Sequence, residues 1–191
     1  ARTSCESSYL FQKFTRHTLN SPHVDNCARV CHSPSLKGMR MTIGEGAATN
    51  PYNDIYNCEF MIVIGSNTTE AHPVLAMEMK RAVLRGAKLI VADPRRIWLA
   101  GMADHYLQLT PGTDVSLLNT MAHVIIAEGL TDEAFIAQHT EGYEAVAEAV
   151  AEWTPERAEV ICGVPAEDIR VAARLYATTH KAGIYYTLGI T

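Results

Sequence analysis

The sequence predicts an α/β fold with a mostly parallel sheet flanked by helices. Short apolar runs at 60–64 and 88–92 are almost uninterrupted, as in strands that are buried on both faces. Segments with the apolar spacing of helices alternate with these runs. Strands that alternate with helices along a chain favour a parallel sheet with helices on both faces.

The expected elements fall into two parts. Residues 6–19 carry apolar side chains at helical spacing, and a brief helix is expected at 35–41. The stretch 20–56 is otherwise rich in Gly, Pro, Ser and Asn with little periodicity, and connections of this length are usually functional. From residue 59 onward, strand and helix patterns alternate without internal repeats.

The alternating part has clear element boundaries. Gly86 ends one helix as a C-terminal cap, and the pair Asp93-Pro94 stops a strand. Pro155 and Pro165, each followed by acidic residues, mark the first turns of two further helices. The strands are expected at 60–64, 88–92, 105–109 and 182–187, and the helices at 72–85, 113–128, 132–138, 143–152, 155–162 and 166–178.

Composition and charge argue against several classes of protein. The chain has 191 residues, 48% of them hydrophobic and 19% charged, which is typical of a globular domain with a core. A net charge of −5 without a Lys/Arg cluster argues against nucleic-acid binding, and the apolar runs are too short to span a bilayer. Five cysteines, an odd number, favour reduced thiols over a secreted disulfide scaffold. We therefore expect a cytoplasmic protein, with a periplasmic parent whose signal has been removed as the alternative.

Both ends of the sequence predict a piece of a larger protein. Residue 1 is not Met, and residues 184–191 are a strand-like run with no terminal cap. Within the piece we expect two parts. Residues 1–58 contain the Cys31 segment and the long loop, and residues 59–191 form the α/β domain.

The run at residues 26–35 carries the strongest chemical signal. Cys31 is a candidate ligand for a soft metal, His32 beside it can exchange protons near neutral pH, and Cys27 lies four residues earlier. The spacing of the two thiols matches neither a zinc knuckle nor a C-x-x-C redox pair. By residue type alone, a cysteine is more often a small buried apolar residue, and a histidine a hydrogen-bonded core residue.

Three loops at predicted strand ends carry groups suited to a nucleotide. In an open parallel sheet, ligands bind outside the carboxyl ends of the strands. Residues 65–72 form a small turn before a helix, which suits a phosphate, and residues 93–96 offer an acid for ribose and two Arg for phosphate. Residues 111–114 open a helix with a carboxylate that can accept two N–H groups of a guanine edge. Each loop taken alone is also explained by a plain strand end, turn or helix cap.

Together these segments resemble a known family. The run at 26–35 resembles the active-site segment of molybdenum- or tungsten-dependent formate dehydrogenases. The three loops look like the dinucleotide-binding segments of the molybdopterin oxidoreductase superfamily, and the resemblance extends from about residue 7 to the end of the chain. It implies that residues 59–191 are a dinucleotide-binding domain, the Rossmann-like half of a molybdopterin-binding domain in a catalytic subunit.

The resemblance implies a role for each candidate residue. Cys31 would ligate molybdenum or tungsten, His32 would relay the proton released from formate, and Cys27 would lie near the pterin. The other cofactor-binding residues that it implies are Gly65, Ser66, Asn67 and Glu70 for pyrophosphate and ribose, Asp93, Pro94 and Arg95 for the nucleotide, and Gly112, Thr113 and Asp114 for guanine.

The implied cofactor is bis(molybdopterin guanine dinucleotide) with Mo or W. Enzymes of this family usually have an N-terminal 4Fe-4S domain and an Arg that orients formate, and this chain matches neither segment. We therefore expect the piece alone to be inactive and to lack the 4Fe-4S cluster of the full enzyme. The expected partners are formate, the remaining domains of the same subunit, and iron–sulfur or other electron-transfer subunits, with no nucleic acid and no membrane span.

Two other functions stay open. The chain could belong to another molybdopterin oxidoreductase, such as a nitrate or oxyanion reductase, because only the sequence His32-Ser33-Pro34 favours formate. It could also be a nucleotide-binding module without redox chemistry, which would use the three loops and keep Cys31 as a buried thiol.

Overall fold

The computed structural model describes residues 3–48 and 50–191, which belong to two compact units. One unit is Ala1–Thr49 together with Thr191, and the other is Asn50–Ile190. Within the described part of the chain, every helix is too short or too polar to cross a bilayer.

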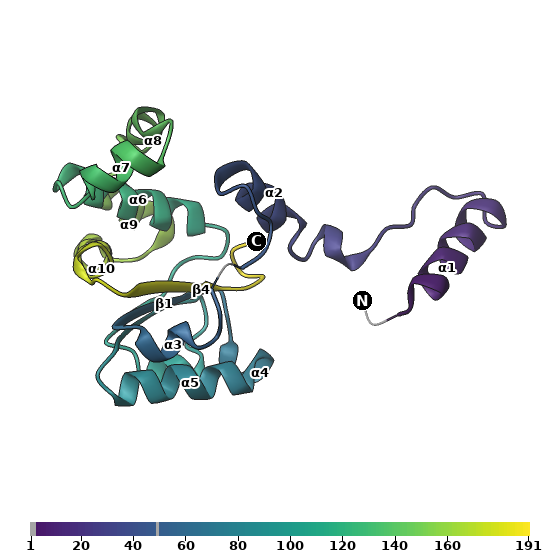
Figure 1. The fold of residues 1–191 in the computed structure, drawn as a ribbon, viewed down its shortest axis with the longest axis horizontal. Coiled ribbons are helices and arrows are strands. Elements are labelled where there is room, and N and C mark those ends of the chain that lie inside the picture. Colours follow the sequence, from purple (N-terminus) through teal and green to yellow (C-terminus); the bar gives the residue numbers. More distant parts are fainter. Residues whose placement is uncertain (1–2, 49) are drawn as a thin grey trace. The chain divides into compact units, whose positions relative to one another are not determined.

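The larger unit is built on a four-stranded parallel sheet, which confirms the predicted fold class (Figure 1). Its strands are β1 (Phe60–Ile64), β2 (Lys88–Ala92), β3 (His105–Leu107) and β4 (Ala182–Tyr186), and their order is β3-β2-β1-β4. The central strand β1 pairs with both β2 and β4, so that Phe60 aligns with Lys88 on one side and Ala182 on the other.

Two strands are shorter than the sequence predicts. The strand expected at 105–109 ends at Leu107, because the N–H of Leu109 turns back to donate to the carbonyl of Leu107 at 3.1 Å and leaves the ladder. The last strand ends at Tyr186 rather than Thr187, because its partner strand β1 ends at Ile64, the residue that aligns with Tyr186.

Helices cover both faces of the sheet (Figure 1). One face carries α3 (Asp54–Asn57), α4 (Thr68–Ala71) and α5 (Pro73–Leu84), and a 3-10 turn, η2 (Trp98–Gly101), follows β2 on the chain. The other face carries α6 (Asp114–Ala127), α7 (Glu133–His139), α8 (Tyr143–Val150), α9 (Pro155–Cys162) and α10 (Ala166–Thr178), with α7 and α8 farthest from the sheet. The one-turn helices α3 and α4 were not predicted, because four residues are too few to show a helical period.

Alternate residues of the strands build two separate cores. Phe60, Ile62 and Ile64 of β1 point into a core formed with α6, α9 and α10, while Met61 and Val63 point into a core formed with α5 and η2. All five β1 residues are buried, as expected for a strand covered by helices on both faces.

The smaller unit has little buried surface. It contains α1 (Cys5–His17), a 3-10 turn η1 (Cys27–Arg29) and α2 (Ser33–Thr42). Among its described residues only Thr15 and Gly46 are buried, and the apolar side chains Tyr9, Leu10, Phe11 and Phe14 of α1 are 49% to 64% exposed. Local hydrogen bonds, such as that from the Ser7 N–H to the Ser4 hydroxyl, therefore account for more of its order than apolar packing does.

Replacing Gly65 by Ala should destabilise the larger unit more than the same change at Gly129. Both residues have positive φ, +56° and +66°, so each Ala costs roughly 1–2 kcal/mol of backbone strain. An added Cβ at Gly65 would also lie 2.8 Å from the Cα of Gly189, whereas nothing lies within 4 Å at Gly129. We expect a total loss of about 3 kcal/mol or more at Gly65 in urea unfolding of the 191-residue chain. Equal losses at the two sites would show that the close approach to Gly189 does not matter.

Candidate functional site

The carboxyl ends of the four parallel strands meet at one edge of the sheet. The loops that leave this edge begin at Gly65, Asp93, Gln108 and Thr187. The structure therefore brings the three predicted nucleotide loops to the same edge, where an open parallel sheet binds its ligands. A fourth loop, residues 187–190, joins them and was not anticipated.

Backbone hydrogen bonds of Gly65 connect the loop after β1 to the end of β2 and to the segment after β4. Its N–H donates to the carbonyl of Ala92 at 3.0 Å, and its carbonyl accepts from the Thr187 hydroxyl at 2.9 Å and from the Gly189 N–H at 3.1 Å. The absence of a side chain at Gly65 thus permits a close approach of protein backbone. Its predicted contact with pyrophosphate stays a prediction.

The rest of this loop is more buried than its polar sequence suggests. Ser66 and Thr68 are each only 2% exposed, Asn67 is half-buried and Glu70 is exposed. The helix expected at 72–85 is present as α5, which begins at Pro73, and the single turn of α4 (Thr68–Ala71) lies between it and the end of β1. The backbone and hydroxyl groups of this loop are the groups that could bind an anion.

Two hydroxyls in this loop have no hydrogen-bond partner in the described structure. These are the buried Oγ1 atoms of Thr68 and Thr69. A buried hydroxyl without a partner costs about 1–3 kcal/mol, so such atoms call for a polar ligand or water. Neither threonine is among the predicted cofactor-binding residues, although both lie within the predicted phosphate loop.

The loop after β2 uses Asp93 to hold its own turn. Asp93 is 7% exposed, and its Oδ1 accepts from the Arg95 N–H at 2.8 Å. The carbonyls of Asp93 and Pro94 accept from the Tyr106 hydroxyl at 2.9 Å and the Gln108 amide at 3.0 Å. Burial raises the pKa of Tyr106 and the charge of Asp93 raises it further, so this hydroxyl remains a donor at neutral pH. Arg95 is exposed, which leaves its guanidinium able to meet a phosphate.

The loop after β3 ends at the start of α6. The Thr110 N–H donates to the carbonyl of Cys162 at 2.8 Å, which anchors the loop to α9, and the Thr113 hydroxyl donates to the carbonyl of Thr110 at 2.6 Å. Gly112 supplies the positive φ of +82° that this turn needs. Asp114 is half-buried, and its carboxylate makes no hydrogen bond or ion pair with the described residues. It could therefore accept donors from a ligand.

Cys31 and His32 lie in the smaller unit, between η1 and α2. The Cys31 N–H lies 3.0 Å from the carbonyl of Cys27 and 3.2 Å from that of Ala28, which fixes the backbone beside a half-buried thiol. The Nδ1 of His32 lies 3.3 Å from the Thr191 hydroxyl and 3.4 Å from the Ser35 hydroxyl. The adjacency of thiol and imidazole was expected from the sequence, but the two hydroxyl neighbours were not.

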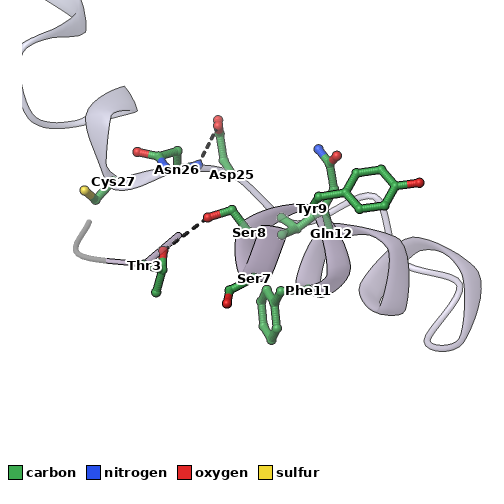
Figure 2. A pocket seen from close by; sticks show the side chains of 10 residues that line it. Thr3, Ser7, Ser8, Tyr9, Phe11, Gln12, Asp25, Asn26 and Cys27 are labelled. Atoms are coloured by element: carbon green, nitrogen blue, oxygen red, sulfur yellow. Dashed lines mark hydrogen bonds between the residues drawn. The ribbon is translucent and has the colours of Figure 1, made fainter. Parts of the chain in front are cut away.

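Cys27 lies on the wall of a pocket in the same unit. Figure 2 shows this pocket, of about 620 Å³, between side chains of α1 and the segment that leads to η1. Polar groups from Thr3, Ser7, Ser8 and Asn26 share its lining with Tyr9 and Phe11. Among the residues that the structure describes, no group of three or more His, Cys, Asp or Glu side chains is placed to hold a metal ion.

A parallel α/β sheet with polar loops gathered at the carboxyl ends of its strands belongs to the class of open α/β domains that bind their ligands outside those strand ends. The sequence model of the molybdopterin oxidoreductase family matches residues 1–188, and the chain belongs to that family. Membership confirms the predicted family and implies a molybdopterin cofactor with Mo or W. The residues present fit such a group, because the strand-end edge offers buried hydroxyls that lack partners and Cys31 offers a half-buried thiol.

Individual relatives carry formate dehydrogenase names. The chain is 45% identical over 191 residues to the F420-dependent formate dehydrogenase subunit alpha of Methanocaldococcus jannaschii, covering 100% of this chain and 28% of that protein. It is 44% identical over 189 residues to formate dehydrogenase H of Escherichia coli, covering 99% of this chain and 26% of that protein. The chain thus spans little more than a quarter of the length of these relatives.

A solved structure with a similar fold has a different name. Acetylene hydratase from Pelobacter acetylenicus superposes with a TM-score of 0.77 at 32% identity, over 95% of this chain and 24% of that chain. This similarity supports the predicted α/β architecture. The same architecture therefore occurs in proteins whose names denote different reactions.

Replacing Asp93 by Ala should loosen the 93–97 turn, whereas Asn should preserve it. The Ala variant loses the acceptor for the Arg95 N–H, a loss that costs about 0.5–2 kcal/mol when a similar side-chain cap is removed. The Asn variant keeps an oxygen in the same place. Urea unfolding, with hydrogen exchange at the Arg95 amide, measures both effects. If the two variants were equally stable, Asp93 would not hold the turn through this bond.

Proposed function

We propose that this chain is part of the catalytic subunit of a molybdenum- or tungsten-dependent formate dehydrogenase. The observation that carries the proposal is the 44–45% identity to formate dehydrogenase alpha subunits and formate dehydrogenase H along essentially the whole chain. The adjacency of Cys31 and His32 supports it. Because the chain spans only about a quarter of those relatives, the reaction belongs to the larger subunit.

The reaction is the oxidation of formate to carbon dioxide, one proton and two electrons. When bound, the molybdopterin cofactor with Mo or W would supply the two-electron acceptor. We assign to Cys31 the ligation of the metal through its thiolate, which suits a soft, redox-active centre. His32 takes up the proton released from formate, because imidazole is the side chain that exchanges protons near neutral pH.

The cofactor in this proposal is bis(molybdopterin guanine dinucleotide), with one dinucleotide arm held at the strand-end edge. Gly65, Ser66, Asn67 and Glu70 would contact pyrophosphate and ribose, and Asp93, Pro94 and Arg95 the nucleotide. Gly112, Thr113 and Asp114 would hold guanine, and the half-buried carboxylate of Asp114 supports this assignment. Cys27 would lie near the pterin. The unpartnered hydroxyls of Thr68 and Thr69 add two further candidates.

The division of the chain into residues 1–58 and residues 59–191 is also part of the proposal. In this division, the first segment carries the metal ligand and the second carries the dinucleotide. The structure itself groups α3, which lies before residue 59, with the larger unit. The proposed partners are formate, the remaining domains of the subunit and iron–sulfur or other electron-transfer subunits. The proposed location is the cytoplasm, with the periplasm as the alternative.

A second candidate is another reaction on the same cofactor. The structural similarity to acetylene hydratase supports this candidate, because the name of that protein denotes a hydration and not an oxidation. Nitrate or oxyanion reduction is a further possibility within the family. Assays of the full-length subunit with formate and with nitrate separate these reactions, and nitrate reduction without formate oxidation would replace the proposal.

Replacing Cys31 by Ser in the full-length subunit should remove formate oxidation. Replacing a group that only hydrogen-bonds to a metal ligand lowers metal affinity or activity by roughly 10–100-fold. Loss of the ligand itself should lower the rate of formate oxidation by more than that. Turnover with a dye acceptor and metal content by mass spectrometry measure the effect. Cys5→Ser is the matched control, because Cys5 is an exposed thiol in α1 and should leave both values unchanged. Near-normal turnover of the Cys31→Ser variant would contradict the proposed role.

The 191-residue chain alone should fold in its α/β part but hold no Mo or W and oxidise no formate. A cofactor that contacts several domains binds weakly to one of them alone. The entropy lost on immobilising the cofactor and its loops is nearly the same, but only part of the favourable contacts form. Circular dichroism, metal analysis and a formate–dye assay on the purified chain test this expectation. Stoichiometric metal together with turnover would show that the chain contains the complete site.

A further inference from the structure

The imidazole of His32 meets two hydroxyls at the same edge of its ring. Its Nδ1 lies 3.3 Å from Thr191 Oγ1 and 3.4 Å from Ser35 Oγ, and the two hydroxyl oxygens lie 3.1 Å from each other. The three atoms thus form a closed triangle of hydrogen-bond distances. All three residues are half-buried, so bulk water competes with these bonds less than it would at an exposed site.

The two hydroxyls come from different parts of the chain. Ser35 lies in the first turn of α2, three residues after His32, and the N–H of Leu36 in the same turn donates to the carbonyl of His32 at 2.8 Å. Thr191 lies 159 residues from His32 in the sequence and belongs to the same compact unit. The ring edge is therefore held both by its own helix and by a distant segment.

Hydroxyls suit this task because each can donate or accept. Either ring tautomer can be accommodated, since a hydroxyl donates to Nδ1 when that nitrogen is bare and accepts from it when it carries hydrogen. The bond between Ser35 and Thr191 limits the rotation of both groups. Unlike a carboxylate, the pair contributes no net charge beside Cys31, so its contribution is orientation.

We infer that Ser35 and Thr191 are positioning residues that hold the His32 ring in a single orientation next to Cys31. This inference rests on the proposed function of His32 in formate oxidation. It adds two residues to which neither the sequence patterns nor the relatives' names assign a role. The hydrogen bond at one ring nitrogen of a functional histidine sets its tautomer and orientation, and loss of a group that orients a neighbour of a metal site lowers metal affinity or activity by about 10–100-fold.

The first test measures formate oxidation by the full-length subunit. Thr191→Val, which removes the hydroxyl at nearly constant volume, should lower kcat about 10-fold with little change in KM, and Ser35→Ala should act in the same direction. Thr191→Ser restores the hydroxyl and should recover most of the loss. Thr178→Val is the matched control, because its exposed hydroxyl bonds only to the carbonyl of Arg174 at 2.8 Å. A loss in Thr191→Val that Thr191→Ser does not recover would overturn the inference.

A double-mutant cycle separates positioning from a general structural effect. If Thr191 acts through His32, then Thr191→Val should cause no further loss in a His32→Ala background. A structural role would give the same fold-loss in both backgrounds. An equal 10-fold loss with and without His32 would therefore also overturn the inference.

A crystallographic comparison does not depend on the reaction. Full-length protein should show one orientation of the His32 ring with both hydroxyls in contact, and the Ser35→Ala/Thr191→Val variant should show more than one. If the parent protein does not oxidise formate, the proposed function fails and the ring orientations alone decide the inference. An unchanged single orientation in the double variant would overturn it.

Discussion

The parallel pairing of β1 with both β2 and β4 is the constraint on which the larger unit depends. β1 is buried along its whole length and supplies side chains to two cores on opposite faces. Parallel pairing in both directions places the carboxyl ends of all four strands at one edge. Loops that are far apart in the sequence become neighbours there, and the candidate nucleotide site exists only because of this arrangement.

The carbonyl of Gly65 extends this constraint into the loops. It accepts hydrogen bonds from two groups of the segment after β4, while the N–H of Gly65 bonds to the end of β2. A loop held from both sides can bury Ser66 and Thr68 without apolar side chains of its own. The hydroxyls of Thr68 and Thr69 in this loop have no hydrogen-bond partner among the described residues, and a polar ligand at this edge would relieve the cost of their burial.

The smaller unit is organised differently. Two of its described residues are buried, so apolar packing contributes little to its order. Short-range bonds set the backbone around Cys31: its N–H approaches the carbonyls of Cys27 and Ala28, and the Ser33 hydroxyl donates to the carbonyl of Ala28 at 2.6 Å. Individual bonds of this kind contribute about 1 kcal/mol each. The orientation of a side chain such as His32 then depends on a few polar contacts, which explains why two hydroxyls can matter to it.

The sequence by itself determined the α/β class, the strands at 60–64 and 88–92, and most of the long helices. The spacing of apolar residues along the chain indicates whether an element is buried on one or both faces, and residues such as Gly86 and Pro155 mark element boundaries within a few residues. It also identified the Cys31–His32 pair and the three polar loops, because these are contiguous segments. Only the tertiary structure decided that β4 lies beside β1, that Thr187 bonds to Gly65 across 122 residues, and that Thr191 reaches His32. The reason is physical: a hydrogen bond between distant segments depends on the tertiary arrangement of the chain, and a local pattern of residues does not specify that arrangement.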